Sequence, residues 1–153
     1  KHLGAVATVN AKYENAPEAI REITKGGAHV SIDALGIAQT CQSSVSSLRK
    51  RGRQLQIGLT TRAEEGMIPL PIDLIVQYEI QLIGSLGMQP SRYPNMLSMV
   101  EKGKLNPGAL VTQTISLEEA PRIFNEMDNF QNLGVTVVDK WGKWSKRIGE
   151  GFK

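Results

Sequence analysis

The sequence predicts an α/β fold with a mainly parallel sheet, and three observations support this prediction. Short apolar strand patterns alternate with helical patterns along the chain. Glycines separate most of these segments from one another. The composition, with 41% apolar and 22% charged residues, is that of an ordinary globular domain. In sheets of this kind, ligands bind beyond the carboxyl ends of the strands.

Three elements are predicted in the first part of the chain. A short apolar run at Val6–Val9 is a strand candidate. Pro17 suits the first turn of a helix, which the paired glycines at 26–27 should end. The stretch HVSIDALG, residues 29–36, then alternates apolar and polar residues as a half-buried strand does, and it stops at Gly36.

A helix and two strands are predicted in the middle part of the chain. Apolar residues recur at helical spacing and form one face, which comprises Ala38, Cys41, Val45 and Leu48. Gly52 should end this helix. Leu55 and Ile57 then carry a strand that ends at Gly58, and Ile80–Leu86 is a further strand.

The last part of the chain is predicted to form two further pairs of a helix and a strand. Apolar residues at helical spacing between Tyr93 and Val100 indicate the first helix, and Leu110–Thr114 follows it as a strand. An S-x-x-E pattern at 116–119 is typical of a capping box at the start of a helix. Val135–Val138 is the last predicted strand.

The composition limits the cellular location and the class of protein that we expect. The single cysteine, Cys41, allows no internal disulfide, so we expect a reducing, cytoplasmic compartment. No apolar run of about 18 residues is present, and we expect no membrane span and no signal peptide. The chain starts with Lys1 rather than Met, which suggests a fragment or a processed chain.

The net charge of +3 resides in residues 139–153, which comprise Asp139 and the C-terminal tail, residues 140–153. The rest of the chain is neutral, so we expect no nucleic-acid partner. Trp141, Trp144, Ile148 and Phe152 fall near one helical face, which is compatible with a basic amphipathic helix for a membrane surface or a partner. The tail's glycines instead favour a short extension docked on its own domain, or a non-native sequence.

Three predicted strand ends are similar, because each carries glycine at or just after the end of the strand. They read Ala34-Leu35-Gly36, Ile57-Gly58-Leu59 and Gly84-Ser85-Leu86-Gly87. Glycine at a strand end lets another backbone or a ligand approach closely. Either these glycines only turn the chain, or the three ends together form a ligand-binding edge.

The sequence also resembles the zinc-dependent medium-chain alcohol dehydrogenases over about residues 1–139. The resemblance rests on an ordered set of motifs, comprising Leu3-Gly4-Ala5, Gly26-Gly27-Ala28-His29-Val30, Asp33-Ala34-Leu35-Gly36, Ile57-Gly58-Leu59, Gly84-Ser85-Leu86-Gly87 and Gly134-Val135-Thr136-Val137-Val138. It implies a partial Rossmann-type parallel sheet with flanking helices, followed by the family's returning C-terminal segment. The family's first strand, glycine-rich loop and ribose-binding acidic residue would precede Leu3. The G-x-G at 149–151 follows no strand and is discounted.

The resemblance implies backbone contacts to the nicotinamide half of the cofactor. Leu35 and Gly36 match positions that line the nicotinamide ribose, and Ile57 matches a strand end whose carbonyl meets the nicotinamide amide. The full set of implied cofactor-binding residues is Leu35, Gly36, Ile57, Leu59, Ser85 and Gly87. Many members carry an Arg near the last strand that reaches the pyrophosphate, but residues 133–135 contain none.

We expect neither catalytic residues nor a metal site in this chain. His2, His29 and Cys41 lie far apart and lack metal-ligand spacing. In the family, the zinc ligands belong to the N-terminal catalytic domain. Asp33 could hold a ribose hydroxyl, although a strand-end carboxylate that caps nearby amides is an equal alternative.

Two functions remain open at this stage. The resemblance implies part of an NAD- or NADP-dependent enzyme that transfers hydride between a small alcohol and the cofactor, inactive and without tightly bound cofactor on its own. The alternative is a non-catalytic nucleotide-fold module that associates with itself or a partner. A homo-oligomer is expected in either case, because the family pairs a strand from the region matching Met67–Ile83 across a two-fold axis, and because the strand at 29–34 would have an open edge.

Overall fold

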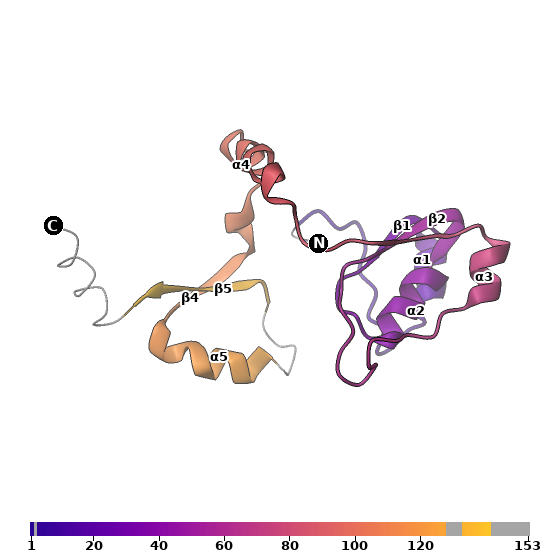
Figure 1. Ribbon diagram of the computed structural model, residues 1–153, viewed down its shortest axis with the longest axis horizontal. Coiled ribbons are helices and arrows are strands. Elements are labelled where there is room, and N and C mark those ends of the chain that lie inside the picture. The colour runs from indigo at the N-terminus through magenta and orange to yellow at the C-terminus, as the bar shows by residue number, and fades with distance from the viewer. Residues whose placement is uncertain (2, 128–132, 142–153) are drawn as a thin grey trace. The chain divides into compact units, whose positions relative to one another are not determined.

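The computed structural model of the 153-residue chain describes residues 1, 3–127 and 133–141. The chain divides into two compact units, Lys1–Gly87 and Met88–Lys153. Figure 1 labels most of their helices and strands. His2 and the sequence after Trp141, with its G-x-G pattern and most of the basic tail, lie outside the described residues. No helix among the described residues is long and apolar enough to cross a membrane.

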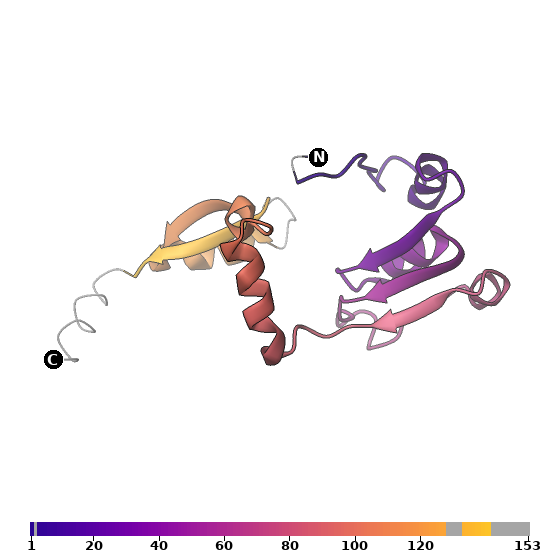
Figure 2. The ribbon, with the colours of Figure 1, turned by 90° about the horizontal axis from the view of Figure 1, so that it is seen from above.

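The first unit contains a three-stranded parallel sheet in the order β1-β2-β3. Its strands are β1 (Ala28–Asp33), β2 (Leu48–Gln56) and β3 (Gln81–Gly84). Asp33 lies opposite Gln56, and Gln56 lies opposite Gly84. The three strands therefore end at one edge of the sheet, and Figure 2 shows their arrowheads pointing the same way.

Three helices accompany this sheet, and two of them contribute to the core of the first unit. The three helices are α1 (Ala16–Ile23), α2 (Ala38–Ser46) and α3 (Ile72–Gln77), and the two that contribute to the core are α2 and α3. The buried core cluster consists of Val45 from α2, Leu48 at the start of β2 and Ile80 just before β3. Leu74 and Ile75 of α3 pack against it. The core therefore lies toward the amino ends of the strands and leaves their carboxyl ends accessible.

Arg21 fastens α1 to the end of α2. Its Nε donates to the carbonyl oxygen of Ser46 at 3.0 Å, and its Nη2 donates to that of Leu48 at 3.1 Å. The guanidinium also lies 5.4 Å from the centre of the Tyr78 ring, within cation–π range. Carbonyls at a helix C-terminus have no partner within the helix, and Arg21 supplies a donor for that of Ser46.

The start of β2 corrects one prediction. The helical spacing up to Leu48 predicts a helix that continues to residue 52, but α2 ends at Ser46 and β2 begins at Leu48. Leu48 is fully buried and pairs with Ala28, so a contact across the sheet prevails over local spacing. The register between β1 and β2 then shifts, and residues 49–52 bulge from the pair.

One further prediction needs correction. Val6–Val9 forms no strand, because no described strand pairs with it; the chain turns after it, where the Asn10 side chain accepts from the amide of Lys12 at 3.0 Å. The stretch Met67–Ile83, which is expected to supply a strand that pairs across a two-fold axis, contains helix α3 and most of strand β3, and the pairing stays a prediction. The strand β3 in this stretch is parallel to β2 of the same chain.

The second unit contains a two-stranded parallel sheet of β4 and β5. Its helices and strands are a 3₁₀ turn at Pro90–Arg92, α4 (Tyr93–Glu101), a 3₁₀ turn at Pro107–Leu110, β4 (Val111–Ser116), a 3₁₀ turn at Leu117–Glu119, α5 (Ala120–Met127) and β5 (Val135–Lys140). Ile115 of β4 and Ile123 of α5 are buried. The alternation of helices with parallel strands confirms the predicted α/β class, although the strands lie in two sheets.

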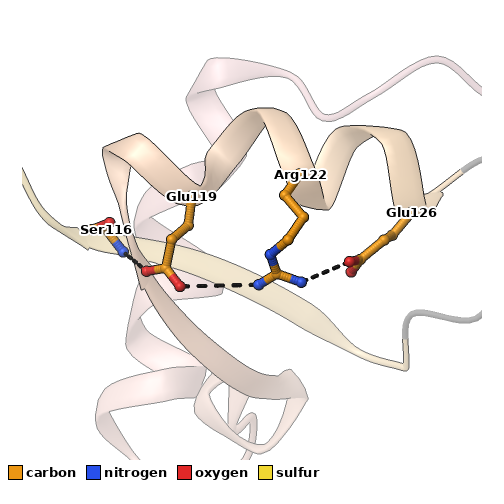
Figure 3. Close-up of polar contacts among 4 residues, drawn as sticks. All are labelled: Ser116, Glu119, Arg122 and Glu126. Atoms are coloured by element: carbon orange, nitrogen blue, oxygen red, sulfur yellow. Dashed lines mark hydrogen bonds and ion pairs between the residues drawn. The ribbon is translucent and has the colours of Figure 1, made fainter.

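The predicted capping box before α5 is confirmed. The Ser116 amide donates to Glu119 Oε2 at 2.9 Å, and the Ser116 side chain accepts from the Glu119 amide (Figure 3). Arg122 lies 4.0 Å from the Glu119 carboxylate and 2.7 Å from that of Glu126. The bond from the Ser116 amide is the main cause that lowers the pKa of Glu119 below its usual value. Local sequence alone therefore determines how this helix begins.

Candidate functional site

Backbone hydrogen bonds join the ends of the three strands in the first unit. The amides of Ile57 and Gly58 both donate to the carbonyl oxygen of Asp33, at 2.9 and 3.0 Å. The amide of Ser85 donates to the carbonyl oxygen of Gln56 at 3.0 Å. Each strand end is therefore bonded to its neighbour, so the edge is one continuous structure.

Two glycines bring the loops after β1 and β2 into direct backbone contact. A Cβ on Gly36 would lie 2.0 Å from the carbonyl oxygen of Leu59, and a Cβ on Gly58 would lie 2.4 Å from the Gly36 nitrogen. Gly36 also has a φ of +88°, which disfavours any other residue. Close packing of backbone on backbone therefore accounts for these two glycines.

The loop after β3 is more open. A Cβ built on Gly84 or Gly87 meets no described atom within 4 Å. Gly87 has a φ of +54°, so its conformation favours glycine even though space is available. This loop is tied to its neighbour through Ser85 and leaves room on its outer side.

The carboxylate of Asp33 is buried at this edge, at the end of β1. Only 3% of the residue is exposed. Oδ1 accepts from the amides of Leu35 and Gly36 at 3.1 and 3.2 Å, and from the hydroxyl of Thr40 at 2.9 Å. Oδ2 accepts from Nε2 of Gln56 at 2.7 Å. Of the two alternatives for Asp33, the structure shows the one in which it caps nearby amides.

The charge of this buried carboxylate is stabilised by its donors. Burial by itself raises the pKa of Asp33, and it is the largest single influence. The hydrogen bonds from Gln56, Gly36, Leu35 and Thr40 together outweigh burial, so the pKa lies below its usual value. Asp33 is therefore ionised at neutral pH.

Gln56 extends the network from β1 across β2. Its Nε2 donates to the carbonyl oxygen of Gly58 at 2.8 Å as well as to Asp33. Its Oε1 accepts from Gln54 at 2.8 Å and from the Cys41 thiol at 3.2 Å. Sequence reasoning missed Gln56 and Thr40. The alternation of Gln54 and Gln56 in a strand of a parallel sheet was the available signal, since such strands are usually apolar.

Most of the predicted cofactor-binding residues lie at this edge. Leu35 and Ile57 are 44% and 45% exposed, Leu59 is largely exposed, and Gly36 is buried between them. The structure brings these four together through the contacts described above. Ser85 joins them through Gln56, and Gly87 follows two residues later in the open loop.

A cavity of about 270 Å³ opens beside the same edge. Its lining includes Gln56, Gly58 and Gly84 from the strand ends and Cys41 from α2. Pockets for drug-sized ligands usually have volumes of roughly 300–1,000 Å³, so this cavity suits part of a larger ligand.

The described residues do not fit a zinc ion. They contain no group of three or more His, Cys, Asp or Glu side chains that could hold a metal. Cys41 is buried, and burial together with the charge of Asp33 raises the pKa of its thiol, which disfavours the thiolate that zinc requires. Nε2 of His29 lies 2.7 Å from Nη1 of Arg49, away from the strand ends.

Comparisons with known proteins agree on one family. The family model described as zinc-binding dehydrogenase matches residues 1–102. The chain is 33% identical over 139 residues to an NAD-dependent alcohol dehydrogenase of Sulfurisphaera tokodaii, and 30% identical over 138 residues to a D-arabitol-phosphate dehydrogenase of Enterococcus avium. Each alignment covers 90% of this chain and 38% of the relative.

Solved structures give the same result. The alcohol dehydrogenase TADH from Thermus sp. ATN1 matches with a TM-score of 0.78 and 25% identity, over 91% of this chain and 39% of that protein. The chain thus spans about 38% of the length of the curated relatives that it matches. The resemblance found in the sequence is confirmed, and the chain belongs to the zinc-binding dehydrogenase family.

Proposed function

We propose that this chain supplies the nicotinamide-binding edge of an NAD(P)-dependent alcohol dehydrogenase, which transfers hydride between an alcohol and the cofactor. One observation carries the proposal: three parallel strand ends are bonded into one accessible edge, in a chain of the zinc-binding dehydrogenase family. Relatives described as alcohol and polyol-phosphate dehydrogenases support the same reaction class. The nicotinamide ring, when bound, supplies the hydride chemistry.

The hydrogen-bond pattern at this edge favours a ligand that donates. The amides of Leu35, Gly36, Ile57, Gly58 and Ser85 all donate to other groups of the chain. These residues can therefore offer a ligand their carbonyl oxygens and side chains. A carboxamide NH₂ carries two donors, and the nicotinamide amide has this group. We assign the contact to the carbonyl of Ile57, with Ser85 and Gly87 completing it and Leu35 and Gly36 lining the ribose.

We propose weak cofactor binding by this chain alone. Backbone hydrogen bonds contribute about 0.5–1.5 kcal/mol each, and association costs an estimated 4 kcal/mol or more. Two or three contacts to the nicotinamide end then give a dissociation constant near or above ~1 mM. Isothermal titration of NAD and NADP, with metal analysis of the purified chain, tests this. Micromolar affinity, or one zinc ion per chain, would contradict the proposal.

A second proposal concerns self-association through β1. This strand lies at one end of the strand order, and Val30 and Ile32 on it are 45% and 59% exposed. Exposed apolar edge strands pair with other chains. We expect light scattering at micromolar concentration to show a dimer or larger species. Ile32→Lys should shift the chain toward the monomer, whereas Ile72→Lys on α3, where the apolar residue is equally exposed, should not. A compact monomer for the unmodified chain would count against self-association.

A further inference from the structure

We propose that Asp33 is a positioning residue for the nicotinamide end of the cofactor, which it does not itself touch. This inference rests on the proposed function and names the group that holds the edge in shape. It concerns the carboxylate and the loops Leu35–Gly36, Ile57–Leu59 and Ser85–Gly87.

The hydrogen bonds of Asp33 place it beneath the ligand surface. A carboxylate offers about four lone-pair positions, and this one accepts four hydrogen bonds, from Leu35, Gly36, Thr40 and Gln56. Only 3% of the residue is exposed. Because so little of the residue is exposed, a ribose hydroxyl would have to displace the surrounding structure to reach the carboxylate, so the role of Asp33 is internal.

The same carboxylate acts directly on the first two strand ends, and a backbone bond joins the third end to the second. Through Oδ1 it fixes the two amides that shape the turn at Leu35–Gly36. Through Oδ2 it orients Gln56, whose Nε2 also donates to the Gly58 carbonyl. The backbone carbonyl of Gln56 in turn accepts from Ser85. A ligand that contacts the loops after β1 and β2 thus depends on one buried charge.

The chemistry of the pair Asp33 and Gln56 provides the test. Asp33→Asn retains an oxygen for Leu35, Gly36 and Thr40, but it places an NH₂ group against the NH₂ group of Gln56. The double variant Asp33→Asn with Gln56→Glu restores a donor facing an acceptor. Ser31→Ala is the matched control, because Ser31 lies on the same strand and its buried hydroxyl has no partner among the described atoms.

Each chain is titrated with nicotinamide mononucleotide, and backbone amide NMR measures the binding at a temperature where every variant is fully folded. We expect about tenfold weaker binding for Asp33→Asn, the loss of one good hydrogen bond, with unchanged binding for Ser31→Ala and partial recovery in the double variant. A purely structural role would lower the melting temperature of Asp33→Asn and leave its affinity unchanged, which would overturn the inference. If the unmodified chain shows no response at the three loops, the proposed function fails instead.

Discussion

Gly36→Ala is expected to destabilise the first unit more than any other single-methyl addition at the candidate site. The new Cβ would lie 2.0 Å from the carbonyl oxygen of Leu59 and 2.9 Å from the carbonyl carbon of Gly58, so the two loops would have to separate. The left-handed φ of +88° adds its own strain. Together, we expect a loss of about 3–5 kcal/mol in the free energy of unfolding.

Gly66→Ala is the control for this prediction. Gly66 has nearly the same φ, +84°, but a Cβ there meets no described atom within 4 Å. It should therefore lose only the conformational strain, about 1–2 kcal/mol. Urea denaturation of both variants measures the difference, provided that the slope with denaturant stays the same. Equal losses for Gly36→Ala and Gly66→Ala would show that the loops after β1 and β2 are not in contact.

Asp33→Asn is expected to lower the free energy of unfolding at neutral pH. It should also make this free energy depend less on pH in the acid range. The pKa of Asp33 in the folded chain lies below its usual value of 3.8, so the ionised carboxylate stabilises the folded state. This contribution is complete above the unfolded pKa and is lost as the pH falls through the folded pKa. At pH 7 we expect Asp33→Asn to lose about 1.5–3 kcal/mol, the range for a hydrogen bond to a charged group.

Denaturant unfolding from pH 7 to pH 3 measures this effect. The unmodified chain should lose stability as the pH falls below about 5, and Asp33→Asn should lose less over the same interval. The pH profile of Glu119→Gln serves as a comparison for that of Asp33→Asn. The pKa of Glu119 is also lowered, but this residue lies in the second unit. Parallel pH profiles for the unmodified chain and Asp33→Asn would mean that the carboxylate is not stabilised by its donors.

Local patterns were sufficient to predict the strand at β1 and the capping box at Ser116. Each of these depends on residues within a few positions of one another, where spacing and turn chemistry act directly. The partners of Asp33 show the limit of this approach. Gln56 lies 23 residues away from Asp33, and only the pairing of β1 with β2 brings the two together.

The elements predicted wrongly have the same physical cause. Leu48 continues the helical spacing of α2, yet its burial against Ala28 places it in a strand. Val6–Val9 has the composition of a strand, but a strand also requires a neighbour to accept and donate its hydrogen bonds. The order of glycine motifs identified the family where periodicity could not, because several of those glycines mark close backbone contacts.

Mapping the binding of nicotinamide mononucleotide on the unmodified chain tests the central claim most directly. Amide NMR at millimolar ligand should show saturable shifts in the loops after β1, β2 and β3, where the proposed residues are Leu35, Gly36, Ile57, Leu59, Ser85 and Gly87. Amides of β4 and β5 in the second unit should remain unchanged. Absence of shifts in the three loops at millimolar ligand, or equal shifts in both units, would contradict the assignment of this edge to the nicotinamide half of the cofactor.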